Sequence, residues 1–569
     1  MVFQRLFFSF WKVLLAMVTN FRCMYLAQKE VKGNKYWYLE ESEHTEDGSR
    51  TKFSLYLGKP DRIYDLVRRP LQRLVLSTHT FGTTAALLHG VEELGLEEIL
   101  SDEMSLKGRA AMSPAQRLVM ILGARYERPA SKLDTVTDWY GDSVLPLLWK
   151  CNVPHVNTVY ETMDGLTSEV RERVKDRLRE RLFEMGFEPE RLVWGTTNFY
   201  SYGEVNDLRR KGKSKDGKHG CPLVGLGVLT SEEDIPLTQV VFPGNRHDKK
   251  VFERSLPSLL NLVEEVSEDS KDITLIFDRG CNDEDLIRII EETTHCVGKL
   301  KRNQDPGELL QTPVDKLDHL YTTEKDYEVR GLKTEGEVFG KPRKIVVMWH
   351  EGTAKKKTER LQRLKEGALE ACRDLEERVG SGGRGRNFTS DGIQRALKQF
   401  KEISDALDWN FNEKDQSFSW QYDEEEWNRL LNEAGKSLLF TTRENWSAKR
   451  ITRAYEGKWR VERSFKLLKG PISVRPIYHW SENRIQEHLF LIYLLLVIHR
   501  YLMEEIREKV LEEFEIGEKT VHHLLKELHL ITGKLSDDDD PDFSIENKGT
   551  IEQAIFEKLN LERFRPRTG

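Results

Sequence analysis

The strongest constraint on the fold is a series of short apolar segments that begins at Arg191 and alternates with helical stretches. The first three segments are "LVW", "CPLVGLGVLT" and "PLTQVVF", and the last two are "ITLIFD" and "HCVGKLK". Two amphipathic stretches, "KKVFERSLPSLLNLVEEV" and "NDEDLIRIIEE", separate the third segment from the fourth and the fourth from the fifth. The order of three strands, helix, strand, helix and strand predicts a mixed α/β sheet.

The remaining sequence divides around this sheet, because a chain of 569 residues is too long for one hydrophobic core. The order of elements is that of a ribonuclease-H-like core, which we expect to combine residues 188–301 with residues 437–512. Residues 302–436 are strongly charged, so we interpret them as an inserted domain and not as a continuation of the sheet. Three further regions are expected: a β-rich element (24–75), an N-terminal helical region (76–187) and a C-terminal tail (513–569).

The composition is that of an ordinary soluble protein, with 32% charged residues and a net charge of -7. This sum can hide basic patches, and the helical region carries many basic side chains, among them Arg109, Arg117, Arg125 and Lys132. Ser113 and Pro114 before "AQRLVMILGARY" predict a helix start in that region. The six cysteines are scattered with no Cys-x-x-Cys pair, which indicates a reducing compartment and argues against a zinc site.

Two apolar runs need to be weighed as membrane segments. "LFFSFWKVLLAMV", residues 6–18, is shorter than the roughly 20 residues that span a bilayer, and no small-x-small cleavage site follows it. Residues 1–23 are therefore a spurious extension before a true start at Met24, a real extension that does not span, or a membrane signal. "LFLIYLLLVI", residues 489–498, is also too short and is interpreted as a buried core helix. We expect no stable membrane association.

Two segments carry side chains suited to chemistry. "LIFDRG" ends a strand with Asp278, which is a common place for a metal ligand and also for a turn cap. One long helix is expected from Ser447 to Lys469, with Trp459, Val461, Phe465 and Leu468 facing a core. Its other face combines one acid with bases and a phenol within an arc of roughly 80°: Tyr455, Lys458, Glu462, Lys466 and Lys469. This face is either a surface with ordinary ion pairs or a metal-binding Glu beside phosphate-binding lysines.

The spacing Tyr-x2-Lys-x3-Glu-x6-Lys at 455, 458, 462 and 469 resembles the Tyr-Arg-Glu-Lys signature of DDE transposases of the insertion-sequence-4 superfamily. Lys458 stands where the family has Arg. "FPGNRHD", residues 242–248, resembles the Gly-Asn-x-x-Asp stretch of the family, and "DRG" at 278–280 resembles its second catalytic Asp. "VRPIYHW" and "RIQEHLFLIYLLL" resemble the segment after the signature. The resemblance covers roughly residues 24 to 510.

The resemblance implies a function in DNA transposition and recombination. Asp278 and Glu462 would be catalytic ligands of Mg²⁺ or Mn²⁺, which support strand cleavage and strand transfer. Tyr455, Lys458, Lys466 and Lys469 would contact DNA. The implied partners are double-stranded DNA, both terminal inverted repeats and target, and a second copy of the chain in a synaptic homodimer. The implied location is the prokaryotic cytoplasm, with association with the nucleoid when DNA is bound.

Gly195 departs from the family pattern. The family has Asp at the end of the first strand, followed by Thr, whereas this chain has Gly195, Thr196 and Thr197. Because that Asp usually bridges both metal ions, its absence leaves two carboxylates for two metals. The chain is therefore expected to bind DNA and to cleave it poorly; the alternative is a catalytically dead, end-binding remnant or domesticated copy. Nearby acids do not fall at a position that obviously substitutes: Glu188, Glu190 and Glu204.

Other candidates are less specific. His247 and Asp248 open a helix and are interpreted as caps. "LRRKGKSKDGKHG", residues 208–220, is either a DNA-binding loop or a solvated hairpin, and its basic residues are Arg209, Arg210, Lys211, Lys213, Lys215 and Lys218. Four tryptophans could stack a flipped base, and the sequence does not choose among Trp409, Trp420, Trp427 and Trp446. A structural protein anchored in a membrane remains a rival on residues 6–18 alone.

Overall fold

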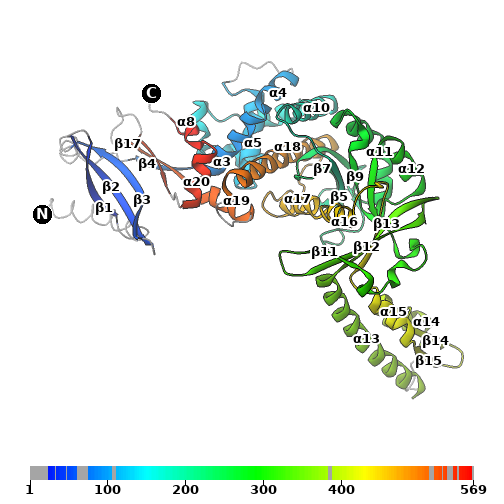
Figure 1. Cartoon of the computed structure of the whole chain (residues 1–569). Coiled ribbons are helices and arrows are strands. Elements are labelled where there is room, and N and C mark those ends of the chain that lie inside the picture. Colours follow the sequence, from blue (N-terminus) through cyan, green and yellow to red (C-terminus); the bar gives the residue numbers. More distant parts are fainter. Residues whose placement is uncertain are drawn as a thin grey trace.

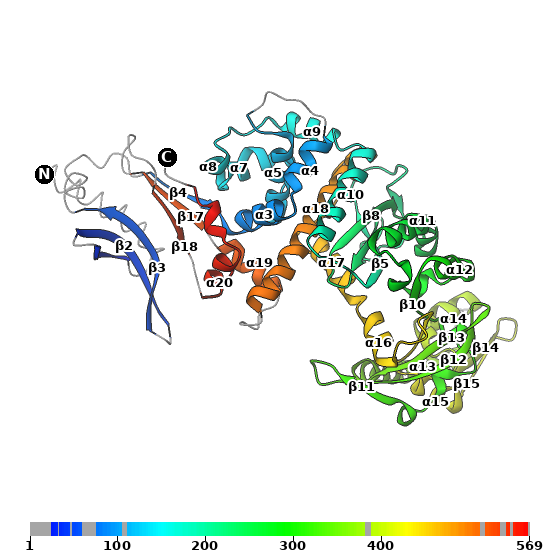
Figure 2. The same cartoon turned by 45° about the horizontal axis from the view of Figure 1, so that its top comes forward.

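A computed structural model describes most of the chain, in an extended arrangement of several parts (Figure 1). The described residues are 24–31, 34–45, 48–59, 75–104, 111–381, 388–511, 518–527, 529–534, 542–546 and 550–566. The prediction about residues 1–23 and the start at Met24 lies outside them. A small sheet stands at one end, the helical region and the large sheet follow, and the inserted domain forms the other end (Figure 2).

The N-terminal β-rich element is a three-stranded antiparallel sheet in the order β1-β2-β3. Its strands are β1 (Met24–Val31), β2 (Asn34–Thr45) and β3 (Gly48–Gly58). A second small sheet joins β4 (Val75–Thr80) to the C-terminal strands β17 (His529–Lys534) and β18 (Asp542–Glu546). The interpretation of residues 513–569 as a tail is therefore wrong for the described part, because β17 pairs with β4 and Phe556 and Leu561 are buried in the main core. Two C-terminal helices accompany these strands: α19 (Glu518–Glu527) and α20 (Thr550–Lys558).

The helical region follows β4 as expected, and the longest of its helices pack on one another and on the buried helix α18 (Glu482–Ile506). Ser113 starts α5 with a capping box, because its hydroxyl accepts from the N–H of Gln116 at 3.1 Å and Gln116 Oε1 accepts from the N–H of Ser113 at 3.0 Å. The predicted helix start is thus confirmed. The helices are α3 (Gly82–Glu93), α4 (Leu96–Glu103), α5 (Pro114–Glu127), α6 (Lys132–Asp134), α7 (Tyr140–Asp142), α8 (Leu145–Trp149), α9 (Val156–Asp164) and α10 (Ser168–Glu184).

The predicted mixed α/β sheet is confirmed. Its ten strands run in the order β11-β12-β13-β16-β10-β9-β5-β7-β6, with β8 paired to β7. The pairs β5–β9 and β9–β10 are parallel, and the other pairs are antiparallel. The core elements are β5 (Arg191–Tyr200), β6 (Arg210–Lys211), β7 (Pro222–Ser231), β8 (Pro236–Pro243), α11 (Asp248–Val266), β9 (Thr274–Ile276), α12 (Glu284–Thr293), β10 (His295–Lys299) and β16 (Lys436–Thr441).

The prediction that residues 302–436 do not continue the sheet is wrong for their first half. β11 (Asp318–Thr322), β12 (Glu328–Val338) and β13 (Lys341–His350) extend the sheet because β13 pairs with β16. β13 joins the sheet because it contains three consecutive apolar residues that are fully buried in the main core, although their sequence neighbours are charged: Ile345, Val346 and Val347. A separate core forms only beyond β13, among α13 (Glu351–Gly380), α14 (Ser390–Leu397), β14 (Leu407–Asn412), β15 (Ser417–Tyr422) and α15 (Glu424–Asn432).

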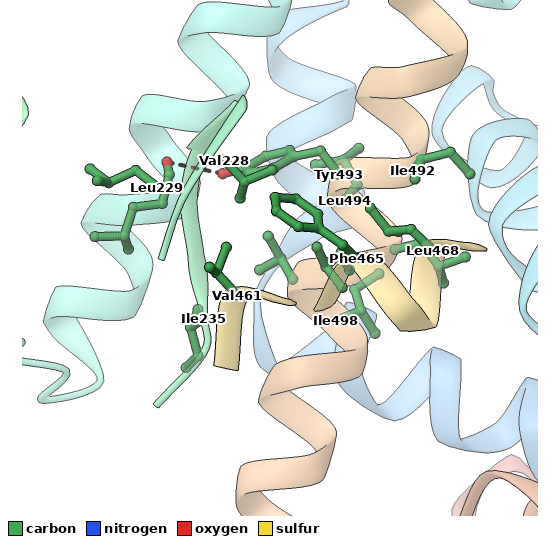
Figure 3. Packing of buried hydrophobic residues seen from close by; sticks show 14 of the residues in the cluster. Val228, Leu229, Ile235, Val461, Phe465, Leu468, Ile492, Tyr493, Leu494 and Ile498 are labelled. Carbon is green, nitrogen blue, oxygen red and sulfur yellow. Dashed lines mark hydrogen bonds between the residues drawn. The ribbon is translucent and has the colours of Figure 1, made fainter. Parts of the chain in front are cut away.

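The helix expected from Ser447 to Lys469 is broken into α16 (Ala448–Glu456) and α17 (Trp459–Lys469). The break falls at Gly457, a residue with a poor helix propensity. Val461, Phe465 and Leu468 point into the core, where α17 faces Leu494 and Ile498 of α18 (Figure 3). Trp459 was expected to join them, but its side chain lies outside this core and is 51% exposed.

The apolar run 489–498 lies within α18, and all ten of its residues are buried, as predicted. Tyr493 reaches the sheet through its hydroxyl, which donates to the carbonyl of Leu237 at 3.1 Å. Within the described residues, we find no helix with the length and apolar character needed to cross a membrane.

Candidate functional site

A cavity of about 440 Å³, which we call the carboxylate pocket, lies where β9 ends beside β5. The last residue pair between β5 and β9 joins Val193 to Ile276. Beyond this pair β5 continues without β9 beside it, and the cavity lies at that edge of β5. Asp278 follows at the carboxyl end of β9, the usual place for ligands in open α/β sheets. Eight charged residues line the cavity: Lys215, Asp216, Asp248, Asp278, Lys458, Glu462, Lys466 and Lys469.

Asp278 occupies the position that the sequence predicts. Its Oδ1 accepts from the N–H of Arg279 at 2.8 Å and lies 3.0 Å from Nζ of Lys458. Burial opposes ionisation, but the Lys458 ammonium and the Arg279 N–H outweigh it and hold the pKa of Asp278 below its ordinary value. Asp278 is therefore an ionised carboxylate that is already paired with a lysine.

The residues of the predicted signature converge although their helix is broken. Tyr455 lies on α16, Lys458 precedes α17, and Glu462 stands in the first turn of α17. Burial and the negative charges of Asp278 and Glu462 raise the pKa of the Tyr455 phenol, so both carboxylates act on this one side chain. Lys466 and Lys469 line the same cavity one and two turns farther along α17.

Asp248 is a pocket residue that sequence reasoning assigned to a helix cap. It is the first residue of α11, and His247 before it makes no side-chain capping bond. The hydroxyl of Thr196 donates to Asp248 Oδ1 at 2.6 Å, and Nζ of Lys215 lies 3.2 Å from the same oxygen. The "GNRHD" stretch contains Asp248 and resembles the family motif, but the sequence does not show whether the carboxylate points into the pocket.

Gly195 faces α17, the helix that carries Glu462. A Cβ added at this position would lie 2.9 Å from Cγ1 and 3.0 Å from Cγ2 of Val461, and 3.2 Å from Cε2 of Phe465. Real Cβ atoms essentially never come as close as 2.9 Å to a neighbour, so a side chain at position 195 requires Val461, and to a smaller extent Phe465, to move. The apolar face of α17 is therefore packed closely against Gly195.

Lys469 and Arg475 both pair with Asp216, at 2.6 Å between Nζ and Oδ1 in the case of Lys469. Asp248 and Asp278 have their own lysine partners. Three of the four acids in the pocket are thus neutralised by protein cations. Lys466 has no ion-pair partner among the residues that the structure describes, and it is exposed.

The basic loop divides into residues with different roles. Arg209 was predicted to contact DNA, but it is only 3% exposed and donates to the carbonyls of His479 at 3.3 Å and Trp480 at 2.6 Å. This prediction is wrong, because the guanidinium is used to fix the chain before α18. Arg210 pairs with Asp207 near the surface, and Lys213 is exposed. Two residues of the loop line the pocket, Lys215 and Asp216.

The four tryptophans considered as base-stacking residues do not line the carboxylate pocket. Trp427 and Trp446 are buried, at 4% and 6% exposure. Trp409 and Trp420 pack on the separate core of the inserted domain. These four side chains are therefore structural as far as their described surroundings show.

The pocket does not fit the ligand set of a two-metal site. Such a site needs several carboxylate oxygens directed at one point. Gly195 supplies no carboxylate, and Asp248 and Asp278 are each paired with a lysine ammonium. Within the described part of the chain, no group of three or more His, Cys, Asp or Glu side chains is arranged so that it could hold a metal ion.

Comparison with known proteins identifies the class. The family model for the transposase DDE domain matches residues 197–498, more than half of the 569-residue chain. The chain therefore belongs to the DDE transposases, a family of phosphoryl-transfer enzymes that use a divalent metal. The match begins two residues after Gly195.

A cryo-EM structure of the piggyBac transposase synaptic complex with hairpin DNA is similar at 10% identity and a TM-score of 0.33. The similarity covers 78% of this chain and 79% of that one. No curated protein matches the chain.

Proposed function

We propose that the chain is a transposase of the insertion-sequence-4 superfamily with a ribonuclease-H-like core. It binds double-stranded DNA at terminal inverted repeats and at the target, as a homodimer in the prokaryotic cytoplasm, and its present sequence cleaves DNA poorly. The family match and the confirmed mixed sheet support the class. Two observations support the superfamily: Lys458, Glu462 and Lys469 line one cavity with Asp278, and the charges of Asp278 and Glu462 act on Tyr455.

The observation that carries the low activity is the packing around Gly195. Position 195 carries no carboxylate, and a Cβ added there would lie 2.9 Å from Cγ1 of Val461 and 3.2 Å from Cε2 of Phe465, so the site is packed for glycine. Asp278 and Glu462 remain as candidate metal ligands, and one of them is held by Lys458. Metal ions supply both nucleophile activation and leaving-group stabilisation in this class of reaction, so an incomplete ligand set removes both together.

DNA binding does not need the missing carboxylate. Phosphate groups are attracted by clustered Lys and Arg side chains, and this attraction weakens with salt in proportion to the number of contacts. Lys466 is the lysine of the pocket without a described ion-pair partner, so its ammonium can bind a phosphate without first breaking an ion pair. Lys458 and Lys469 must first leave Asp278 and Asp216.

The test is a binding and nicking assay on a labelled duplex that carries the inverted repeats flanking the gene. The unmodified chain should bind the duplex and leave it uncut in Mg²⁺ or Mn²⁺. Asp278→Ala and Glu462→Ala should bind as well as the unmodified chain. Failure of the unmodified chain to bind the repeats more tightly than an unrelated duplex would contradict the proposal.

A further inference from the structure

A second cavity, of about 850 Å³, lies between the helical region and the start of α18; we call it the cationic pocket. It is formed by the chain after α5, by α9 and by the segment between α17 and α18. Its charged or aromatic lining residues are Arg125, Lys132, Asp134, Tyr160, Arg475, Tyr478, His479, Trp480, Arg484 and His488.

Two basic side chains of this pocket, Lys132 and Arg125, contact neutral acceptors. Lys132 is 4% exposed, and its Nζ lies 3.4 Å from Nδ1 of His488. Arg125 donates to the carbonyls of Ser473 and Ala130, each at 3.2 Å. Among the described residues, neither cation forms an ion pair.

The neighbouring arginines are different, because each has an acid. Arg484 pairs with Asp164 at 2.7 Å, and Arg475 pairs with Asp216. Asp134 also lines the pocket, but it is exposed and its Oδ2 accepts from the N–H of Ser131 at 3.3 Å as part of a helix cap. Within the described part of the chain, no acid therefore pairs with Lys132 or Arg125.

Burial and the charges of Arg125 and Arg484 lower the pKa of Lys132 to about 7. Burial lowers the pKa of Arg125 to about 10. Burial also lowers the pKa of His479 to about 3, so this imidazole stays neutral and adds no charge. A buried cation without a counter-charge is costly, and an anion that enters the pocket would remove that cost.

Two large aromatic side chains stand at the pocket with most of their surface in solvent. Tyr478 is 71% exposed and Trp480 is 73% exposed. Aromatic faces of this kind bind nucleic-acid bases by stacking, with little dependence on sequence. The pocket thus combines a buried positive charge with flat apolar surfaces beside it.

The cationic pocket adjoins the carboxylate pocket. Arg475 lines the first, Lys469 lines the second, and both pair with the same residue, Asp216. A nucleic-acid backbone that lies across the carboxylate pocket can therefore continue into the cationic pocket. A free phosphate ion, in contrast, has no base that could stack on the exposed aromatic side chains. This continuity favours DNA as the source of the anion.

We propose that the cationic pocket binds a backbone phosphate of the DNA that lies across the carboxylate pocket, through Lys132 and Arg125, while an adjacent base stacks on Trp480 or Tyr478. The inference rests on the proposed function, because it assumes that the chain binds DNA. It assigns two DNA contacts outside the signature residues, one from the helical region and one from the segment before α18.

The experiment measures anisotropy of a labelled duplex with a short single-stranded end, in EDTA, over a range of salt concentrations. Lys132→Met should weaken binding about tenfold and lower the slope of log K against log salt by about one. Trp480→Ala should weaken binding about tenfold without a change in slope. The matched control is Lys436→Met, because Lys436 is also buried but donates to Leu310 and Asn432 and lines neither pocket.

The outcomes separate the inference from the proposed function. If the unmodified chain binds the duplex and both variants match the control in affinity and slope, the inference fails and the proposed function stands. If the unmodified chain does not bind DNA, both fail. If inorganic phosphate raises the Tm of the unmodified chain and not that of Lys132→Met, while DNA affinity is equal in both, the pocket takes a small anion and the DNA assignment is overturned. Should Lys132→Met not fold, Trp480→Ala and Tyr478→Ala decide, because both side chains are exposed.

Discussion

The carboxylate pocket and the cationic pocket are linked by Asp216, which pairs with one basic residue of each, but their basic side chains are paired differently. In the carboxylate pocket, Lys215, Lys458 and Lys469 each pair with an Asp. In the cationic pocket, Lys132 and Arg125 contact only neutral acceptors among the described residues. In the carboxylate pocket, lysines of the chain neutralise the acids that a metal ion would otherwise neutralise. In the cationic pocket, by contrast, no described acid neutralises Lys132 and Arg125, and our proposal is that a DNA phosphate does so.

The largest effect should come from completing the acidic set. Gly195→Asp by itself should give little cleavage and cost about 1–3 kcal/mol of stability, because its Cβ meets Val461. Gly195→Asp combined with Val461→Ala should raise metal-dependent nicking at least on the order of 100-fold, since metal stabilisation of a transition state is worth several kcal/mol. The measurement is nicking of the inverted-repeat duplex with and without Mg²⁺.

Val461→Ala is the control for that experiment and should remain inactive. Glu462→Ala added to the double variant should remove the gained activity. A double variant that folds, binds DNA and stays inactive would show that position 195 is not where the missing ligand belongs.

The next effect concerns stability and contrasts two buried lysines. Lys132→Met should raise the free energy of unfolding by about 1–4 kcal/mol at pH 7, because it removes a buried amine that pairs with no acid among the described residues. Lys436→Met should lower it by about 1–3 kcal/mol, because it leaves the acceptors of Leu310 and Asn432 without their donor. Thermal or urea unfolding measures both, and a destabilised Lys132→Met would indicate a structural lysine.

A smaller effect is the pH dependence of DNA binding. The pKa of Lys132 is lowered to about 7 in the free protein, and a bound phosphate favours its protonated form. Affinity should be fully present below pH 7 and fall about fivefold between pH 7 and pH 8. Anisotropy titrations at several pH values should show this fall for the unmodified chain and a flat profile for Lys132→Met.

Three other residues of the pocket, Arg125, His479 and His488, have pKa values that lie away from this window. The pKa of Arg125 is about 10, that of His479 is about 3, and burial and nearby cations hold the pKa of His488 well below its ordinary value. The other charged or phenolic residues that line the pocket are Asp134, Tyr160, Arg475, Tyr478 and Arg484. An equal fall with pH in Lys132→Met would assign the titration to another group.

The smallest expected effect distinguishes the lysines of α17. Lys466→Ala should weaken DNA binding about threefold and lower the salt slope by about one, because its ammonium has no described acid to leave. Lys469→Ala should change the slope less, since Lys469 already pairs with Asp216. A larger slope change for Lys469 than for Lys466 would show that ion pairing in the pocket does not decide which lysine takes the phosphate.

The sequence predicted the mixed sheet and the strand that ends before Asp278, because apolar periodicity reports directly on these features. The family resemblance implied that Asp278 and Glu462 share a site, and both line the carboxylate pocket. It missed Asp248, since an acid at a helix start has the same local pattern whether it caps the helix or faces a cavity. It also grouped Arg209 with its exposed neighbours, although only tertiary packing decides which member of a basic run is buried. The sheet strands at 318–350 were hidden by their charged neighbours. The break in the helix was missed although Gly457, a poor helix former, marks it in the sequence.

The packing of α17 against Gly195 also depends on tertiary structure, so the sequence could not predict it. A glycine in a strand indicates that something approaches closely, and it does not say what. Only the placement of Val461 and Phe465 shows that the missing carboxylate and the position of the helix go together.

The most direct test of the account measures binding and cleavage by the unmodified chain in the same samples. A labelled inverted-repeat duplex is titrated in EDTA and in Mn²⁺, and each sample is then examined for nicked product. The account predicts equal affinity in both conditions and no product, since the pocket cations, and not a metal, neutralise the acids. Abundant Mn²⁺-dependent product that disappears in Asp248→Asn would contradict it and would make Asp248 the third catalytic carboxylate.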